Sequence, residues 1–440
     1  MTVIEDNGKD GNGNQEVKRE NWQLILYASF VAQLLSIMGF SASIPFIPLY
    51  LVKDLNIKTA AEAGLWAGVM AAASALTMAA FAPIWGTLAD RYGRKSMVLR
   101  SMIGGCVIIA LMAFTGNVWL LLILRIFQGA LTGTVPANIA LVASVTPKHR
   151  VGYALGIMQT AVFTGSSIGP LVGGALADLT DYRLTFIITS VALGVAALIV
   201  FFFVNEDFVP VLPDPNAPKL RITARIRLAF SEKLFVAMLI ILSLVQFGNS
   251  VVAPVLALFI QALNGTAEGA STLAGLELGI TGIASAVSAV VAGRLSDRYG
   301  HRKVLIISSL AAAILYFPQA GVSNVWELLI LRGAMGLFFG GIVPSANALI
   351  AQIIPEGRKG AAYGLVSSIT ALGFALGPLT GAAVAAALNT RAVFILTGCV
   401  LLATAFWVNT VLATSREQVE VEVEAEVLTR DDKPQTIRLE

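Results

Sequence analysis

Charged residues are scarce in this chain, and their scarcity indicates which solvent surrounds it. They make up 13% of the 440 residues, whereas 56% of the residues are hydrophobic. Soluble domains contain about 25% charged and roughly 45–50% apolar residues, so this composition excludes an ordinary soluble protein. The sequence therefore indicates a membrane protein, with lipid around most of the folded chain.

Cysteine and histidine are also rare, which excludes several chemistries. Cys106 and Cys399 lie in separate apolar stretches and imply no disulfide framework. His149 and His301 fall in predicted loops, so we expect neither a metal site nor an intramembrane histidine relay. No G-x-x-x-x-G-K-[ST] loop supports ATP-driven pumping, and the net charge of +3 is too small to indicate nucleic-acid binding. We expect no enzymatic site, no cofactor and no metal.

Long apolar stretches are what the sequence does contain. A membrane helix needs about 20 such residues. Twelve stretches reach that length, near 22–50, 64–88, 97–115, 118–145, 153–177, 184–204, 234–262, 272–295, 304–320, 325–353, 361–387 and 391–413. The sequence thus predicts an all-α membrane protein with 12 transmembrane helices.

Polar segments divide the chain into two bundles of six helices, at 22–204 and 233–413. We expect a disordered N-terminal tail at 1–21 and a linker at 205–232 whose "KLRITARIRLAF" forms an amphipathic helix on the inner membrane surface. The C-terminal tail, 414–440, is predicted to be solvated, although its alternating "EQVEVEVEAEV" could pair as a strand.

The basic residues predict the orientation in the membrane. With the tails and even-numbered loops assigned to the inside, two of the 30 Lys and Arg residues lie within helices and nearly all the others lie inside. The exceptions on the outside are Lys53, Lys58, Arg183 and Arg391. By the positive-inside rule both termini are cytoplasmic, and the short loops are typical of a bacterial inner (plasma) membrane.

The chain is internally duplicated. Landmark residues recur in one order at an offset of 207 or 208, namely Gly86 as Gly293, Asp90 as Asp297, Arg125 as Arg332, Gly129 as Gly336, Pro136 as Pro344, Gly169–Pro170 as Gly377–Pro378 and Arg183 as Arg391. Two like-oriented halves, related by an axis along the membrane normal, place a substrate site between them near the midplane. They also permit alternating access by rocking, so the fold suggests a transporter.

Three motifs carry a family resemblance: "GTLADRYGRK" at 86–95, "LLILRIFQGALTG" at 121–133 and "GSSIGPLVGG" at 165–174. Together they resemble the signature set of the Major Facilitator Superfamily, over essentially all of 22–413. The third is similar to the motif of its drug:proton antiporters, and length and loop sizes resemble the 12-span, MdtG-like multidrug exporters. The resemblance implies that the chain exports its substrate.

The first motif lies where the second span leaves the lipid, and its bases alone can hold the short loop inside. A second interpretation adds a latch, because the Asp90 carboxylate can accept hydrogen bonds from the N-terminal amides of a helix in the other half. The resemblance implies that the motif holds the cytoplasmic side shut while the outer side is open. Its residues are Gly86, Asp90, Arg91, Gly93, Arg94 and Lys95, with a weaker copy in Gly293, Asp297, Arg298, Arg302 and Lys303.

The third motif puts small residues on two faces of one helix, at Gly165, Gly169, Gly173 and Gly174, and Pro170 bends that helix. Ordinary close packing of membrane helices explains this pattern equally simply. The motif recurs around Gly377 and Pro378, which argues for paired bent helices at the seam between the halves. The resemblance implies that the bend shapes the sealed cavity of an exporter.

Three charged residues within predicted spans are candidates for proton coupling. Arg125 lies about two turns into 118–145, where an unpaired charge costs at least about 2.5–3.5 kcal/mol. It must face a partner, water or the cavity, or else extend to the outer surface. The resemblance ties it to proton transfer. Its repeat mate Arg332 lies level with Glu277, and we predict a buried ion pair between them, structural or proton-carrying. In the first half, Met70 occupies the position of Glu277.

One departure from the family leaves the proton carrier open. Several relatives carry an acid in the first span, whereas 22–50 offers only Gln33, Ser36, Ser41 and Ser43 as polar groups. Asp178 and Glu327 flank the outer openings, as ordinary loop charges or as guards of proton entry. Spans 1, 4, 7 and 10 would line the cavity, where the candidate contacts are Gln33, Asn138, Gln159, Gln246, Asn249, Asn347, Phe30 and Phe247.

These observations favour a proton-driven exporter of lipophilic drugs, with protons, membrane lipids and a small-molecule substrate as its partners and a monomer as its expected state. Apolar walls with few fixed hydrogen bonds accept varied lipophilic molecules. The alternative is an exporter or importer of a defined metabolite, such as a sugar or siderophore. A dense cluster of cavity carboxylates or hydroxyls would favour that alternative, and the sequence offers none.

Overall fold

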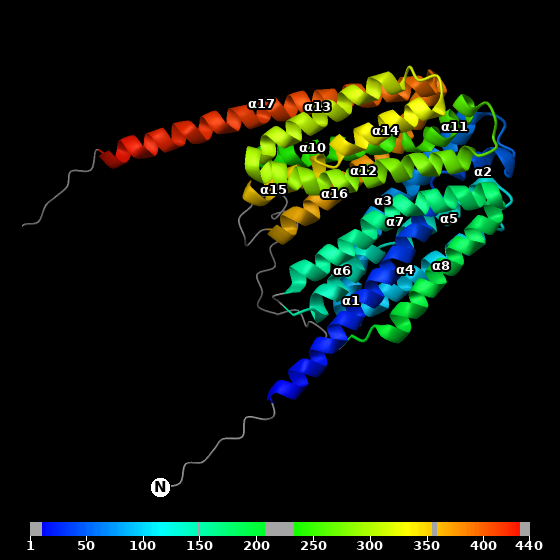
Figure 1. Cartoon of the computed structure of the whole chain (residues 1–440), viewed down its shortest axis with the longest axis horizontal. Coiled ribbons are helices and arrows are strands. Elements are labelled where there is room, and N and C mark those ends of the chain that lie inside the picture. Colours follow the sequence, from blue (N-terminus) through cyan, green and yellow to red (C-terminus); the bar gives the residue numbers. More distant parts are fainter. Residues whose placement is uncertain (1–10, 148–149, 207–232, 354–358, 432–440) are drawn as a thin grey trace, which may run out of the picture.

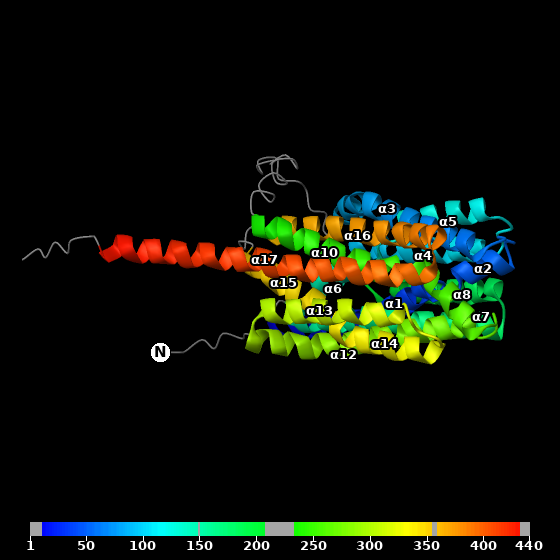
Figure 2. The same cartoon turned by 90° about the horizontal axis from the view of Figure 1, so that it is seen from above.

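The computed structural model describes residues 11–147, 150–206, 233–353 and 359–431. Within these ranges every regular element is a helix. The predicted amphipathic helix of the linker and His149 lie outside the described residues. The long helices run alongside one another in two bundles, and both tails leave from the same end of the molecule (Figures 1 and 2). We name this the tail end and the opposite one the far end.

The first bundle consists of α1 (Gly11–Ala42), α2 (Ile47–Lys53), α3 (Ala60–Tyr92), α4 (Arg94–Met112), α5 (Val118–Leu131), α6 (Thr134–Val145), α7 (Val151–Leu179) and α8 (Tyr182–Phe203). The second consists of α10 (Lys233–Val251), α11 (Ala253–Asn264), α12 (Ala270–Tyr299), α13 (His301–Gln319), α14 (Val325–Phe339), α15 (Ile342–Ile353), α16 (Lys359–Ala387) and α17 (Thr390–Asp431).

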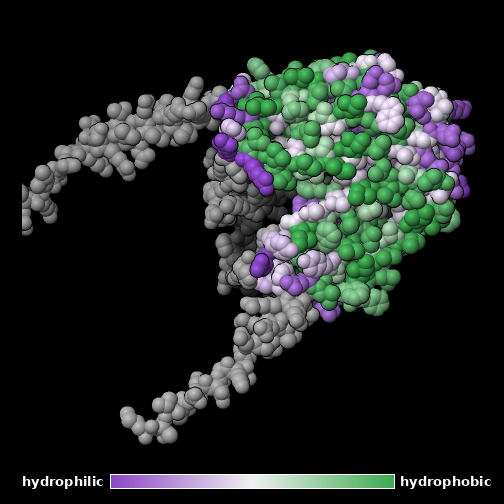
Figure 3. Space-filling view, viewed as in Figure 1, coloured by the Kyte–Doolittle hydropathy of each residue, from purple (hydrophilic) through white to green (hydrophobic). Residues whose placement is uncertain are grey.

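Eleven segments of the described chain are long and apolar enough to cross a membrane, by length and composition. The twelfth predicted span, 304–320, corresponds to α13, a helix of 19 residues that packs against α14 and α17. Its first turn contains His301, Arg302 and Lys303, which lower the hydropathy of this short helix. On the face shown in Figure 3, hydrophobic side chains cover the middle of both bundles and hydrophilic ones gather toward the two ends.

The described parts of both tails are helical, which differs from the predicted disorder of the N-terminal tail and from the strand alternative for the C-terminal one. The structure extends α1 back to Gly11 and α17 on to Asp431, so both bundles continue as helices beyond their apolar segments. Nucleation is the costly step in helix formation, and a formed span lets each further residue add a hydrogen bond without that cost. Glu, Ala, Leu and Arg in the C-terminal segment are also good helix formers. The strand alternative for "EQVEVEVEAEV" is therefore wrong.

Four spans are each broken into two helices, and they are the spans 1, 4, 7 and 10 that were predicted to line the cavity. The breaks separate α1 from α2, α5 from α6, α10 from α11 and α14 from α15. At the α5–α6 break Gly133 has a φ of 131°, a conformation that a side chain would disfavour. Pro48 and Pro254 begin α2 and α11 at positions where a proline costs no helical hydrogen bond.

The two bundles meet along two seams, α7 against α12 and α3 against α16. A Cβ built on Gly68 of α3 would lie 2.6 Å from the carbonyl oxygen of Pro378 in α16. On the other seam, a Cβ on Gly275 of α12 would also collide with a proline carbonyl, that of Pro170 in α7. These two contacts are repeat mates of each other, so the predicted two-fold relation between the halves is confirmed.

Candidate functional site

The space between the bundles is the candidate site. The helices diverge toward the tail end (Figure 1), and a hollow separates the described surfaces of the two bundles there (Figure 3). Toward the far end the short helices α2 and α11 pack against each other, and Gly64 of α3 lies against Val255 and Leu258 of α11. Among the described residues the hollow is thus open at one end of the molecule and closed at the other.

A carboxylate joins the two bundles at the closed end. Asp178, near the end of α7, accepts a hydrogen bond through Oδ2 from the backbone N–H of Thr272 at 2.7 Å. Thr272 lies in the first turn of α12, where backbone amides have no helical acceptor and favour negative charge. The sequence left Asp178 open between a loop charge and a guard of proton entry, and this contact between the bundles was not predicted.

The small-residue motif uses both of its predicted faces. Gly165 and Gly169 face α1, and a Cβ on Gly169 would lie 2.8 Å from the carbonyl oxygen of Met38. Gly174 faces the other way, against the backbone of Ser271 in α12. The second copy repeats the first face, because Gly377 in α16 lies against Phe247 and Ser250 of α10. Pro170 and Pro378 lie inside their helices as predicted.

The described residues of the first motif form their hydrogen bonds within their own bundle. A Cβ on Gly86 or on its copy Gly293 would have no neighbour within 4 Å. Gly93 links α3 to α4 with a φ of 91°, and the backbone N–H groups of Arg94 and Lys95 donate to the Glu206 carboxylate at 3.0 and 2.7 Å. Glu206 thereby caps α4 within its own bundle.

The side chains of Asp90 and Asp297 lie outside the described part of the structure, so the predicted latch stays a prediction. The remaining residues of the two copies have local contacts. Arg91 and Arg298 each lie beside the tyrosine that follows them, and Arg302 donates to the carbonyl oxygen of Asn409 in α17 at 3.1 Å.

The predicted ion pair of the second bundle is present. Nε of Arg332 lies 2.8 Å from Oε1 of Glu277, and the two side chains are 6% and 1% exposed. The Thr281 hydroxyl, one turn along α12, donates to the same carboxylate at 3.1 Å. The rings of Tyr316 and Phe394 flank the guanidinium, with centroids 5.8 and 5.9 Å away. Polar and aromatic neighbours thus surround this buried pair.

Arg125 is buried as well, with 8% of its surface exposed, and does not extend to the outer surface. Its Nη1 donates to Oε1 of Gln128 at 2.8 Å and its Nη2 to Oγ of Ser43 at 3.0 Å. Both acceptors are neutral. Met70, the counterpart of Glu277, is 1% exposed. The two bundles therefore hold their central arginines in different electrostatic surroundings.

The predicted cavity contacts divide into three groups. Gln33 and Asn138 are completely buried and bond to each other, with Nδ2 of Asn138 donating to Oε1 of Gln33 at 3.0 Å. Gln159 and Asn249 are exposed. The others are half-buried, namely Gln246, Asn347, Phe30 and Phe247. Gln33 and Asn138 thus join α1 to α6, whereas Gln159 and Asn249 form no such buried contact.

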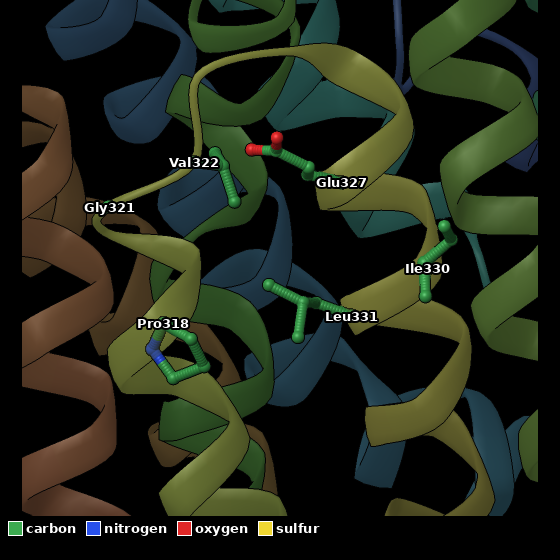
Figure 4. A pocket seen from close by; sticks show the side chains of 6 residues that line it. All are labelled: Pro318, Gly321, Val322, Glu327, Ile330 and Leu331. Carbon is green, nitrogen blue, oxygen red and sulfur yellow. The ribbon is translucent and has the colours of Figure 1, made fainter.

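Two surface hollows lie away from the centre. One of about 410 Å³ at the far end is lined by Pro318, Gly321, Val322, Glu327, Ile330 and Leu331 (Figure 4). Its carboxylate, on Glu327, accepts hydrogen bonds from the backbone N–H of Ser323 and from Nδ2 of Asn324, both at 2.8 Å. Glu327 therefore has the local partners of an ordinary loop charge. The other hollow, about 380 Å³ at the tail end, is lined by Trp22, Gln23, Leu26, Tyr27, Pro147, Arg150 and Tyr153.

Comparison with known proteins identifies the fold and the family. The family model described as Major Facilitator Superfamily matches residues 29–264 and 238–430. The chain belongs to this superfamily. Multidrug resistance protein MdtG of Proteus mirabilis is 36% identical over 388 residues, which cover 88% of this chain and 96% of that protein. MdtG of Salmonella heidelberg is 33% identical over 387 residues, covering 88% and 95%.

Solved structures of other superfamily members share the fold at low sequence identity. The nucleoside transporter NupG superimposes with a TM-score of 0.72 at 13% identity, covering 88% of this chain and 99% of that one. A bacterial homologue of the lysosomal transporter Spinster, inward-facing and occupied, gives 0.72 at 15% identity, covering 89% and 96%. Membership makes this chain a multi-pass membrane transporter and not an enzyme, as the sequence predicts.

Several residues of this superfamily member were missed by sequence reasoning. Glu206 follows the sixth span as a single acid beside the linker, and nothing in its spacing indicates that it caps α4. Gln128 lies three residues after Arg125 on the same helical face, so i, i+3 spacing could have suggested that contact. Ser43 was named only as a polar group of the first span, because its position beside Arg125 depends on the break between α1 and α2.

Proposed function

We propose that this protein exports lipophilic small molecules from the cytoplasm in exchange for protons, as a monomer working by alternating access. The observation that carries the proposal is the hollow between two pseudo-symmetric bundles, open at the tail end and closed at the far end. Relatives at 33–36% identity that bear the name multidrug resistance protein favour drugs as the substrate class.

The distribution of basic residues supports a cytoplasmic tail end. On that orientation the hollow faces the cytoplasm, where an exporter collects its substrate. Exposed Gln159 and Asn249 offer a few hydrogen bonds, and half-buried Phe30 and Phe247 offer apolar surface. Sparse polar groups among aromatic ones suit a site that accepts varied lipophilic molecules.

For proton coupling we assign the carrier role to Glu277. Its carboxylate is held in the bundle by Arg332, and protonation would remove the negative charge and loosen that pair. A proton that binds there changes the packing of α12, a helix that forms one seam with the first bundle. Proton binding and bundle movement are then linked through one element. Arg125 stays the corresponding candidate in the first bundle.

The latch of the first motif belongs to the opposite state of the cycle. When the bundles close at the tail end, Asp90 would accept hydrogen bonds from the first amides of a helix in the second bundle. The described parts of the bundles stand apart at the tail end, and the absence of neighbours around Gly86 and Gly293 supports a disengaged latch.

Accumulation of a fluorescent lipophilic dye in a drug-sensitive bacterial strain tests the proposal. Cells that express the protein should retain less dye than cells with an empty vector, and a protonophore should abolish the difference. Vector cells treated with the protonophore control for its general effects. Equal accumulation in both strains would contradict drug export, and export that survives the protonophore would contradict proton coupling.

A further inference from the structure

Arg125 carries a buried positive charge with which no acidic side chain among the described residues forms a hydrogen bond or ion pair. Its guanidinium contacts Ser43 and Gln128, which are neutral. Its Nε–H has no acceptor among the described residues, although it is buried. Arg125 takes part in neither of the ion pairs seen among the described residues, Glu277 with Arg332 and Asp54 with Arg183.

The second bundle shows what balances the same charge at the equivalent place. In each bundle the glycine one turn after the arginine packs against the helix of the second span, Gly129 of α5 against Ser74 of α3 and Gly336 of α14 against Thr281 of α12. Ser74 and Thr281 lie one turn after Met70 and Glu277 respectively. By this register Arg125 lies level with Met70 of α3, as Arg332 lies level with Glu277 of α12. The equivalent position thus bears a thioether in one bundle and a carboxylate in the other.

The dipoles of the neighbouring helices do not balance the charge difference between the surroundings of Arg125 and Arg332. α1 ends at Ala42, directly before Ser43, and a helix C-terminus offers about half a negative charge. Its repeat mate α10 ends at Val251 and provides the same partial negative charge in the second bundle. The second bundle has the carboxylate of Glu277 in addition. A full charge that is buried without a partner is costly, so the first bundle lacks one negative charge.

We propose that the buried Arg125 guanidinium, beside Ser43 and Gln128 and level with Met70, binds a small inorganic anion of the size and charge of chloride. The Arg125 Nε–H can donate a hydrogen bond to the anion. The Ser43 hydroxyl accepts from Arg125 and can donate its own hydrogen to the anion as well. Burial limits the size of the ligand, since Ser43 and Met70 are 3% and 1% exposed. The proposal goes beyond drug export and does not depend on it.

The test uses the purified full chain and thermal unfolding in sodium chloride or sodium gluconate at equal ionic strength. The wild type should melt about 2–4 °C higher in chloride, with saturation as chloride replaces gluconate. Met70→Glu supplies the missing carboxylate and should abolish the chloride effect. Met70→Gln, which has the same length and no charge, should keep it. This pair separates site binding from general salt effects.

Wild-type crystals grown in bromide provide a measurement that needs no variant. An anomalous peak beside the Arg125 guanidinium is the expected result. Equal melting of the wild type in both salts, an equal chloride effect in Met70→Glu and Met70→Gln, or bromide crystals without that peak would each overturn the proposal. Since no transport is measured, these outcomes are independent of drug export.

Discussion

At the scale of single residues, the second bundle depends on the pair between Glu277 and Arg332. Removing one partner of a buried pair leaves an uncompensated charge, at a cost of about 3–5 kcal/mol. Removing both charges costs less stability, because no buried charge is left unpaired. This difference separates a structural role of Glu277 from its proposed role in proton coupling.

We expect Glu277→Gln to lower the melting temperature and to abolish drug-driven proton release from proteoliposomes. The double change Glu277→Gln with Arg332→Gln should recover much of the stability without recovering the coupling. Glu327→Gln, a carboxylate with local loop partners, is the matched control and should keep the coupling. Proton release that persists in Glu277→Gln would remove this residue from the mechanism.

The same pair marks how far the sequence predicts the site. Glu277 and Arg332 were predicted as a pair from their depth in neighbouring spans, because charges in lipid must find partners. The bond between Glu206 and α4 and the contact of Ser43 with Arg125 could not be predicted. Both contacts depend on the positions at which the chain turns. The average composition of a 20-residue segment does not predict those positions.

At the scale of helices, the packing of α7 against α1 depends on small residues. Gly169→Ala would place a methyl group 2.8 Å from the carbonyl oxygen of Met38, so the helices would have to move apart. We expect a loss of about 1–3 kcal/mol in stability, as for other overpacked sites. Gly156→Ala on the same helix meets no neighbour within 4 Å and is the control.

Thermal unfolding of the two variants in detergent checks this expectation. Gly156→Ala should change stability by at most about 1 kcal/mol, in the stabilising direction, since Ala is the better helix former. If Gly169→Ala were as stable as Gly156→Ala, close packing of this helix pair would not limit the fold. The small-residue faces were predicted from spacing, whereas the four helix breaks were not, because apolar composition continues through them.

At the scale of the whole molecule, Asp178 ties the bundles together at the far end. Asp178→Ala removes the carboxylate that caps α12 across the seam, a contact of about 0.5–2 kcal/mol. We expect the closed far end to open more often, by several-fold in population. Asp181→Ala removes an equivalent cap from α8 within one bundle and should leave that equilibrium unchanged.

Labelling of an engineered far-end cysteine by a membrane-impermeant thiol reagent measures this opening. Faster labelling is expected in Asp178→Ala than in Asp181→Ala, and equal rates would show that the contact does not hold the bundles. The background should carry Cys106→Ser and Cys399→Ser, since both cysteines are free.

Asp90→Ala should act in the opposite sense. If Asp90 latches the tail end when it closes, its loss favours the tail-open state and slows labelling at the far end. Asp90→Ala and Asp178→Ala would then move the same equilibrium in opposite directions, and their combination should restore the wild-type rate in part. Faster far-end labelling in Asp90→Ala would contradict the latch.

The breaks in the four lining spans can act as hinges in the transporter. Each lining helix consists of two rods, and the shorter rods α2 and α11 stand at the far end while α6 and α15 stand at the tail end. A gate built from such rods can swing while the seams α7–α12 and α3–α16 stay packed. Each transport cycle then breaks less apolar contact than a rigid-body separation of the two bundles would.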